Sequence, residues 1–350
     1  MKAAVLEAFG EPLKVHHDWA DPECGPDDVV LEVKACGICR SDNTLWNGGM
    51  KWLEIVPPLP SVLGHEYCGV VEELGSEVVG FARGDRVVSP FCHACGSCEF
   101  CDEGHQNVCA NLTLPGMHYT GGFANYTKVA HADVNVVKLP DEISFPEAAG
   151  MGCRFVTSYH GIVDQAAVMP GEWVAVFACG GVGLSAIDIA SALGARVIAV
   201  SRSPEKLALA EKLGAEHTVT AGPDAPGEIV ELTDGGAHVS VDALGASETA
   251  LPALLSLRTR GRHLRLGVSN KKDDGRIPIP VDVVMFRELS IIGSFGMQAA
   301  RYPEMFDMVA SGKVNPGHLV GDTVALEDTS DVLASMNTYE TVAMPVITQF

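Results

Sequence analysis

The second half of the chain, from residue 171 onward, alternates short apolar runs with helix-like segments, and this alternation restricts the fold more than any other feature. Apolar strands are expected at 172–177, 195–200, 239–242, 263–268 and 289–293, and helices at 184–193 and 206–213. Ser203 precedes the second helix as an N-cap and Gly214 follows its end, as helix capping requires. Strands that alternate with helices predict a parallel, doubly wound sheet of the α/β class.

The turn between the first of these strands and the first helix is rich in small residues and is typical of a dinucleotide-binding loop. Its residues are Ala178, Cys179, Gly180, Gly181, Val182 and Gly183. Gly180 allows the backbone to approach a pyrophosphate, Gly183 allows the helix to pack on the strand, and the helix N-terminus offers free N–H groups to the anion. The pattern departs from G-x-G-x-x-G at Ala178, and a plain corner between strand and helix is the alternative interpretation.

The residues after the second strand indicate which nicotinamide cofactor binds. An acidic residue there is typical of NAD sites, whereas this chain has Ser201, Arg202 and Ser203. Hydroxyl groups and a guanidinium suit a 2′-phosphate, so the sequence favours NADP(H) over NAD(H). In the alternative interpretation, Arg202 is a solvated surface residue and the enzyme accepts both cofactors.

Four cysteines lie close together in a Gly-rich polar segment, at about 92–110. They are Cys95, Cys98, Cys101 and Cys109, with the spacing C-x2-C-x2-C-x7-C. One short lobe of this kind can place four thiolates around a tetrahedral zinc ion, and a coordination shell closed by four sulfurs is structural. Cys92 lies just outside the pattern and is interpreted as a spectator.

Three further residues, Cys39, His65 and Cys153, are candidate ligands of a second metal. His65 stands beside Glu66 before an apolar strand, Cys39 lies upstream in a polar turn introduced by Gly37, and Cys153 lies in a helix of small residues that begins near 145. A thiolate and an imidazole are ligands that Zn²⁺ prefers. Each of these residues taken alone is more typical of ordinary packing.

The first 140 residues read as an irregular β-rich domain, with strands at 3–5, 13–15, 28–35 and within 121–140. A helix is expected at 302–311, after which the chain returns to this first domain. A length of 350 residues also favours two domains.

Composition narrows the classes of function. The formal charge of -21 argues against nucleic-acid and membrane partners. The N-terminus does not read as a signal peptide and no run of 18 apolar residues occurs, so a cytoplasmic location is expected. The 11 cysteines are then expected to be thiols.

Over essentially its whole length, the sequence resembles the zinc-containing medium-chain alcohol dehydrogenases. The matching segments are Gly64-His65-Glu66 with Gly69, Gly75 and Val78; residues 37–42 around Cys39; the four-cysteine lobe; and Gly152-Cys153. The resemblance implies a GroES-like catalytic domain over 1–154 and 298–350, and a Rossmann-type dinucleotide domain over 155–297. It also implies a homo-oligomer, with a tetramer favoured over a dimer.

The resemblance further implies two zinc ions per subunit and a role for each site residue. Cys39, His65 and Cys153 are expected to hold the catalytic zinc and Glu66 to approach it, Asp42 to orient His65, Ser41 to pass a proton and Arg40 to contact the cofactor pyrophosphate. The implied reaction is reversible oxidation of a small alcohol to an aldehyde or ketone, with hydride transfer to NADP or NAD.

Two positions depart from the family pattern. Thr44 replaces a relay histidine, and Ala343-Met344 stand where a Gly-Arg pair often assists the pyrophosphate. The loop with Trp46, Trp52 and Leu53, together with Phe91 and Leu114, is a candidate lining of the substrate pocket, with simple packing as the alternative.

Two other functions stay open. One is a quinone or enone reductase of the same superfamily, whose members lack the zinc ligands. The other is a protein without enzymatic activity that uses the zinc lobe to bind a partner.

Overall fold

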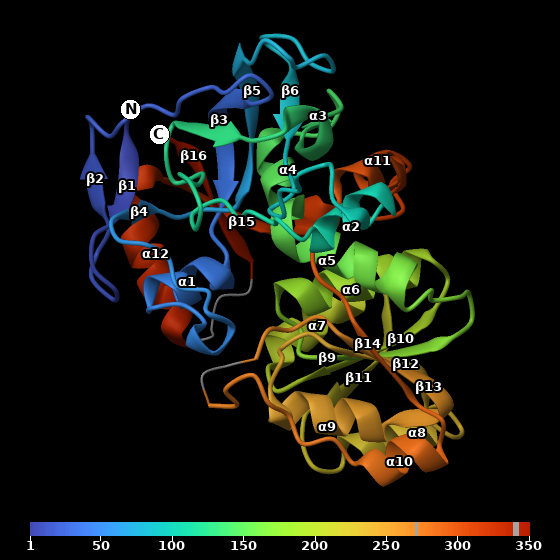
Figure 1. The fold of residues 1–350 in the computed structure, drawn as a ribbon. Coiled ribbons are helices and arrows are strands. Elements are labelled where there is room, and N and C mark those ends of the chain that lie inside the picture. Colours follow the sequence, from blue (N-terminus) through green and yellow to red (C-terminus); the bar gives the residue numbers. More distant parts are fainter. Residues whose placement is uncertain (270–271, 339–342) are drawn as a thin grey trace. The chain divides into compact units, whose positions relative to one another are not determined.

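The computed structural model describes residues 1–269, 272–338 and 343–350, which form two compact units (Figure 1). The first unit contains 1–156, 296–311 and 316–350. The second contains 157–295 and the short stretch 312–315. Each unit has its own sheet system and is described by itself.

The second unit is built on a parallel sheet whose strand order is β11-β10-β9-β12-β13-β14. The strands are β9 (Trp173–Phe177), β10 (Arg196–Ser201), β11 (Ala215–Thr220), β12 (Ala237–Asp242), β13 (Leu257–Arg265) and β14 (Ser290–Gly293). The helices are α5 (Val156–Tyr159), η4 (His160–Gln165), α6 (Gly181–Ala192), α7 (Pro204–Lys212), α8 (Ala225–Leu232), α9 (Ser247–Leu255) and α10 (Val281–Phe286). Two mononucleotide-binding halves joined at β9 give this order, so the predicted doubly wound fold is confirmed.

Burial explains why these segments form the sheet. All five residues of β9 are buried, as expected for a central strand covered on both faces. β11 was not predicted, because its sequence mixes polar and apolar residues. In the structure only Ala215 and Val219 of this strand are buried. β11 lies at one edge of the sheet, where polar side chains are tolerated.

The first unit contains an antiparallel-rich sheet in the order β15-β16-β3-β5-β6-β8, with β7 also paired to β3, and a smaller sheet β2-β1-β4. The strands are β1 (Ala3–Leu6), β2 (Lys14–His16), β3 (Val29–Gly37), β4 (Ser61–Val62), β5 (Glu66–Leu74), β6 (Arg86–Val88), β7 (Tyr126–Val129), β8 (Val137–Lys138), β15 (Val320–Ala325) and β16 (Met344–Gln349). Apolar side chains of both sheets share one core that includes Leu31, Tyr67 and Phe123.

Short helices complete the first unit. They are α1 (Arg40–Trp46), η1 (Lys51–Leu53), α2 (Glu99–Asp102), η2 (Gln106–Val108), α3 (Ala132–Asn135), α4 (Phe145–Gly150), η3 (Met151–Phe155), η5 (Ala299–Arg301), α11 (Tyr302–Ala310), η6 (Pro316–Leu319), η7 (Leu326–Asp328), α12 (Thr329–Ser335) and η8 (Met336–Thr338). β16 pairs with β3 at Val346 and Gly37, so the C-terminal strand completes the sheet next to Cys39.

One predicted strand region differs from the structure. Within 121–140, β7 and β8 form, but Ala132–Asn135 turns into helix α3. The buried Asn135 side chain explains the turn: it accepts a hydrogen bond from Ala94 N and donates to the carbonyls of Ala94 and Ala130. A buried amide with three backbone partners fixes this local fold more strongly than the neighbouring valines favour a strand.

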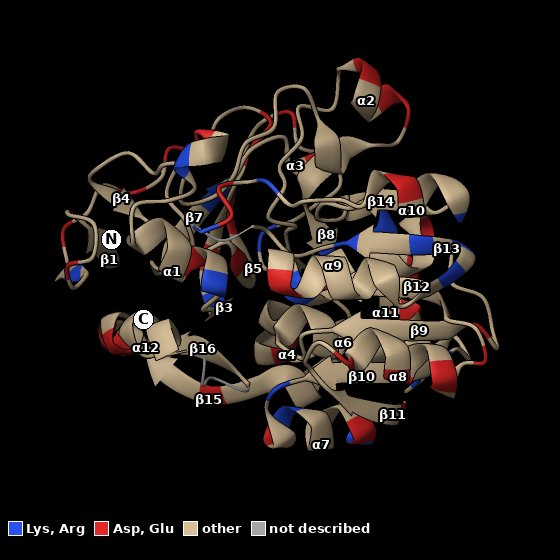
Figure 2. Cartoon of the chain, turned by 90° about the horizontal axis from the view of Figure 1, so that it is seen from below, with Lys and Arg blue, Asp and Glu red and all other residues tan. Residues whose placement is uncertain are grey.

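β13 carries four arginines, and Figure 2 shows blue segments along this strand. Three of its four arginines face carboxylates: Arg262 pairs with Glu172 and Arg265 with the buried Asp242, while Arg260 lies 3.7 Å from Glu288. The fourth, Arg258, contacts the His238 ring. None of the described helices combines the length and the apolar character needed to cross a bilayer.

Candidate metal centres and cofactor turn

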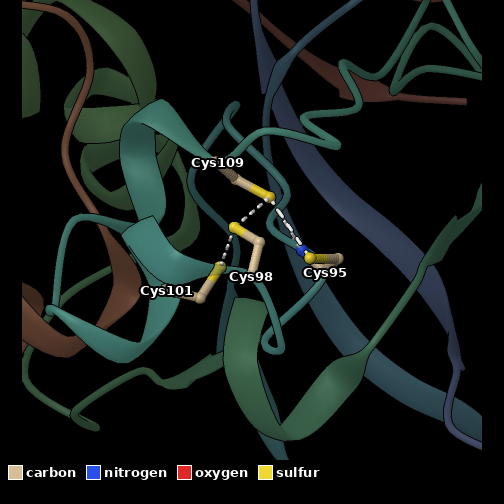
Figure 3. A group of neighbouring side chains, drawn as sticks. All are labelled: Cys95, Cys98, Cys101 and Cys109. Carbon is tan, nitrogen blue, oxygen red and sulfur yellow. Dashed lines mark hydrogen bonds between the residues drawn. The ribbon is translucent and has the colours of Figure 1, made fainter.

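The four-cysteine lobe brings its sulfurs together (Figure 3). Cys98 and Cys101 come from the start of α2, and Cys109 directly follows η2. The Sγ–Sγ distances are 3.5 Å between Cys98 and Cys101, 3.7 Å between Cys98 and Cys109, and 3.4 Å between Cys109 and Cys95. A zinc ion with four sulfurs at about 2.3 Å separates them by about 3.8 Å, so the lobe fits a tetrahedral ion.

Hydrogen bonds prepare the lobe for a cation. The Asn111 amide and the Ser97 backbone lower the pKa of the Cys95 thiol to about 5, and the backbone N–H groups of Ala110 and Cys101 lower the pKa of Cys98. Burial raises the pKa of Cys109 to about 12. Two sulfurs are thus favoured as thiolates, and a bound cation would favour the remaining pair.

The second cluster joins residues from three separate segments. Cys39 directly precedes α1, His65 directly precedes β5, and Cys153 lies in η3. One ligand atom each from Cys39, His65, Glu66 and Cys153 lies within 4.8 Å of the others. The structure therefore brings together all four residues predicted for the catalytic metal. Cys92 belongs to neither group of described residues.

Asp42 ties the first two segments together. Its Oδ2 accepts a hydrogen bond from Cys39 N at 2.8 Å, and its Oδ1 accepts from Gly64 N at 3.2 Å and from His65 Nδ1 at 2.9 Å. Because a carboxylate only accepts hydrogen bonds, Nδ1 of His65 carries the proton and Nε2 remains for a metal. Asp42 is completely buried, so its orientation is fixed by these three donors.

The third segment reaches the cluster through an unusual helix. After α4 the backbone widens into the π-helical turn η3, which contains Gly152, Cys153 and Arg154. A side chain at Gly152 would place its Cβ 2.7 Å from Cα of Glu66. The missing side chain therefore allows η3 to pack against the start of β5, which brings Cys153 to His65.

The electrostatics of the cluster favour a cation. A hydrogen bond from the Cys153 thiol lowers the pKa of Cys39 well below its usual range, and the Arg154 guanidinium acts in the same direction against burial. Burial and the Cys39 sulfur raise the pKa of Glu66 well above its usual range. A buried thiolate beside a desolvated carboxylate is unfavourable without a positive charge, so the residues present fit a divalent metal.

Arg154 lies beside the cluster and is not among the residues predicted for it. Its Nε lies 3.5 Å from Oε1 of Glu66, and its guanidinium donates to the carbonyl of Ile38 at 2.6 Å. The available signal was a single arginine directly after a ligand cysteine, in a helix otherwise made of small and apolar residues.

The other predicted residues around the cluster take different places. The Ser41 hydroxyl lies 3.7 Å from Sγ of Cys39, and the Thr44 hydroxyl donates to the Arg40 carbonyl at 3.1 Å. Arg40 itself donates to the Met336 carbonyl. The Arg40 contact with a cofactor and the Ser41 proton transfer therefore remain predictions.

Two of the aromatic residues predicted near the substrate have separate roles. The ring of Phe91 meets the His65 imidazole edge to face, with centroids 5.8 Å apart, so it lies beside the metal cluster. Trp46 is buried in the core of the first unit and donates to the Glu11 carbonyl, as the packing alternative states.

The glycine-rich turn of the second unit has the shape of a phosphate-binding loop. Gly180 is the N-cap of α6, and a Cβ added there would have open space within 4 Å. A Cβ at Gly183 would lie 2.0 Å from the Ala178 carbonyl oxygen, so only glycine fits. Ala178 adopts a φ of 75°, the conformation that glycine usually supplies at this position.

The strain at Ala178 gives a testable expectation for stability. A left-handed conformation costs a residue with a Cβ about 1–2 kcal/mol, while glycine adds about 0.4–1 kcal/mol of unfolded-state entropy. We expect Ala178→Gly to raise the free energy of unfolding of the second unit by about 0.5–1 kcal/mol. Denaturant unfolding followed by circular dichroism measures this change. Ala186→Gly inside α6 is the control and should lower stability by about 1 kcal/mol; equal losses in both variants would contradict the strain.

Ser201 is the last residue of β10, and Arg202 and Ser203 follow it. Ser201 is buried and its hydroxyl accepts a hydrogen bond from Ser203 N at 3.3 Å. Arg202 is exposed, with its NH2 group 4.0 Å from Oε1 of Glu248 at the start of α9. A cation and a hydroxyl thus stand at the carboxyl end of β10, with a competing carboxylate nearby.

Comparisons with known proteins identify the family. Residues 25–141 match the profile of the alcohol dehydrogenase GroES-like domain, and 181–311 match that of zinc-binding dehydrogenase. An alcohol dehydrogenase of Geobacillus stearothermophilus is 36% identical over 337 residues, 96% of this chain and 96% of that protein.

Solved structures agree with these matches. A crystal structure of an NAD-dependent alcohol dehydrogenase has a TM-score of 0.88 at 34% identity and covers 100% of both chains. The alcohol dehydrogenase TADH from Thermus sp. ATN1 has a TM-score of 0.90 at 30% identity, again over 100% of both chains. The relatives support an oxidoreductase that acts on an alcohol. The chain, with its GroES-like and Rossmann-type folds, belongs to the zinc-dependent medium-chain alcohol dehydrogenase family.

Proposed function

We propose that the protein is a zinc-dependent enzyme that reversibly oxidises a small alcohol to an aldehyde or ketone and transfers hydride to a nicotinamide cofactor. The observation that carries this proposal is the convergence of Cys39, His65, Glu66 and Cys153 within 4.8 Å. Two thiolates and an imidazole are the ligand types of catalytic zinc in alcohol dehydrogenases. The enone reductases considered above lack such ligands.

Cys39, His65 and Cys153 would hold the catalytic zinc, and the cysteine lobe would hold a structural one. When bound, a catalytic zinc supplies Lewis acidity that makes an alcohol easier to deprotonate and a carbonyl easier to reduce. Asp42 orients His65 through Nδ1, and the ring of Phe91 packs against the imidazole. The Ser41 hydroxyl lies 3.7 Å from Sγ of Cys39 and is the proposed acceptor of the alcohol proton.

We propose NADP(H) as the favoured cofactor, bound at the turn from Ala178 to Gly183 with its adenosine end at Ser201 and Arg202. The open space at Gly180 and the N-terminus of α6 suit a pyrophosphate. The exposed Arg202 suits a 2′-phosphate. One structural relative is described as NAD-dependent, so the preference needs a direct test.

Arg202→Ala provides that test. A charge-assisted hydrogen bond to phosphate contributes about 1.5–3 kcal/mol, so we expect kcat/KM for NADPH to fall about 10–100-fold. The value for NADH should stay nearly constant, because no 2′-phosphate is present. Steady-state kinetics with both cofactors measures the two values. A parallel loss with NADH and NADPH would contradict a specific phosphate contact.

We also propose that the protein is a homo-oligomer that uses the β14 edge of the second unit. β14 is an edge strand of its sheet and exposes Ile291, and α10, the helix that precedes it in sequence, exposes Val281, Met285 and Phe286. An exposed apolar sheet edge is a surface that another copy of the strand can cover. Light scattering on the purified protein tests this state.

The proposed function is tested by metal content and a substrate panel together. Protein purified without added zinc should contain two zinc ions per subunit, and it should convert alcohols or carbonyls with NADP(H). Reduction of an enone C=C bond with alcohols inert would instead identify a reductase of the quinone type. A protein that binds neither nicotinamide cofactor would be a non-enzymatic zinc-lobe protein.

A further inference from the structure

Glu66 is a buried carboxylate that lies between the candidate metal cluster and the Arg154 guanidinium. Both of its oxygens are buried, and neither accepts a hydrogen bond from the residues that the structure describes. On one side, one of its oxygens lies within 4.8 Å of ligand atoms of Cys39, His65 and Cys153. On the other side, Oε1 lies 3.5 Å from Nε of Arg154. Because no hydrogen bond fixes this carboxylate, its position depends on the nearest cations.

Arg154 is anchored where it can compete for that carboxylate. It directly follows Cys153, and its side chain is only 13% exposed. Its NH2 group donates to the carbonyl of Ile38, the residue before Cys39, at 2.6 Å. The planar guanidinium can bind a carbonyl and pair with a carboxylate at the same time. Arg154 is therefore held from both sides of the metal cluster.

Arg154 adds a second positive charge to a cluster that is rich in acidic groups. Two thiolates, Glu66 and the buried Asp42 can carry four negative charges, of which a zinc ion neutralises two. The guanidinium neutralises a third and lies beside Glu66. If Arg154 were removed, the metal would be the cation to which the Glu66 carboxylate turns.

We propose that Arg154 is a positioning residue that holds Glu66 away from the catalytic metal and so keeps one ligand position available to the alcohol. This inference rests on the proposed zinc-dependent function. Without the guanidinium, the Glu66 carboxylate binds the metal. The metal then dissociates more slowly, and the enzyme oxidises the alcohol more slowly. Glu66→Gln removes the competing charge, so in that background the loss of Arg154 has little further effect.

A double-mutant cycle in the full-length protein tests this proposal. Wild type, Arg154→Met, Glu66→Gln and the double variant are loaded with Co²⁺ in place of the catalytic zinc, and the visible absorption spectrum reports the ligands of the ion. Release of the metal into a chelator and the kcat and KM of alcohol oxidation are measured in parallel. In Arg154→Met we expect altered cobalt bands, metal release slowed about tenfold and kcat lowered about tenfold. In the double variant we expect all three values to return toward those of Glu66→Gln, because the effects of residues in one charge network are non-additive.

Arg86→Met is the matched control. Arg86 lies in the same unit and also donates to backbone carbonyls, those of Asp141 and Ile143, but it is not among the metal cluster. Its loss should lower stability without changing the cobalt spectrum. If Arg154→Met does not fold, Arg154→Lys keeps the charge without the planar fork and should show a smaller shift in the same direction.

The outcomes separate this inference from the function on which it rests. A wild type that binds no metal beyond the lobe ion would overturn both. If the wild type binds Co²⁺ but the spectrum of Arg154→Met is unchanged, only the role of Arg154 is overturned. The same holds if Arg154→Met and the double variant release the metal at equal rates. In that case the arginine merely caps the Ile38 carbonyl.

Discussion

Replacing Cys39 by alanine is expected to abolish alcohol oxidation while the protein stays folded. Cys39 supplies one sulfur of the proposed catalytic metal site. Its buried side chain is small, so its replacement by alanine removes little packing. Lewis acidity at such a site contributes several kcal/mol, and about 4 kcal/mol corresponds to about a thousandfold in rate. We therefore expect kcat/KM to fall by at least about a thousandfold.

Metal analysis shows whether this loss has the expected cause. Cys39→Ala should retain the lobe ion and lose the other, so zinc content should fall by one ion per subunit. Cys36→Ala is a suitable control, because Cys36 is a buried thiol on the neighbouring strand β3 and belongs to neither metal cluster of the described residues. Retained activity in Cys39→Ala, or only one zinc ion in the wild type, would rule out the catalytic-metal assignment.

Replacing Gly152 by alanine is expected to damage the same site without touching a ligand. The added Cβ would lie 2.7 Å from Cα of Glu66, which is closer than backbone and side-chain atoms normally approach. η3 must then shift away from β5, and Cys153 moves with it. A displacement of about 1 Å at a reactive centre costs about a hundredfold in rate, and overpacking lowers stability by about 1–3 kcal/mol.

Activity, zinc content and thermal unfolding of Gly152→Ala measure these effects. Gly227→Ala is the matched control, because Gly227 lies within α8 and an added Cβ there meets nothing within 4 Å. It should leave activity unchanged and raise stability slightly, since alanine favours a helix. A fully active Gly152→Ala with normal zinc content would show that the close contact with β5 does not position Cys153.

The sequence predicted the cluster residues well because ligand chemistry is local. A C-x2-C-x2-C-x7-C pattern and a His65-Glu66 pair indicate metal binding wherever the chain folds around them. The structure places these predicted residues together, and Asp42 lies against His65. The doubly wound sheet was also predictable, since β9 and β10 are continuous apolar runs between turn residues.

The features that were missed depend on distant contacts. The pairing of Arg154 with Glu66 exists because η3 is π-helical and packs on β5, which no local pattern predicts. Ala178 was recognised as a departure from glycine, but its φ of 75° belongs to a turn in which the Ala178 carbonyl oxygen lies against Gly183. The helix α3 follows from the hydrogen bonds of Asn135 to a separate segment.

The three hydrogen bonds of Asp42 give the two metal clusters different internal supports. They join the segments of Cys39 and His65 through one buried carboxylate. The lobe has a small apolar cluster, with Ala94, Leu112 and Val134 around the cysteines, and a segment of this kind folds around its ion. We expect a chelator to unfold the lobe while the segments of Cys39 and His65 stay joined.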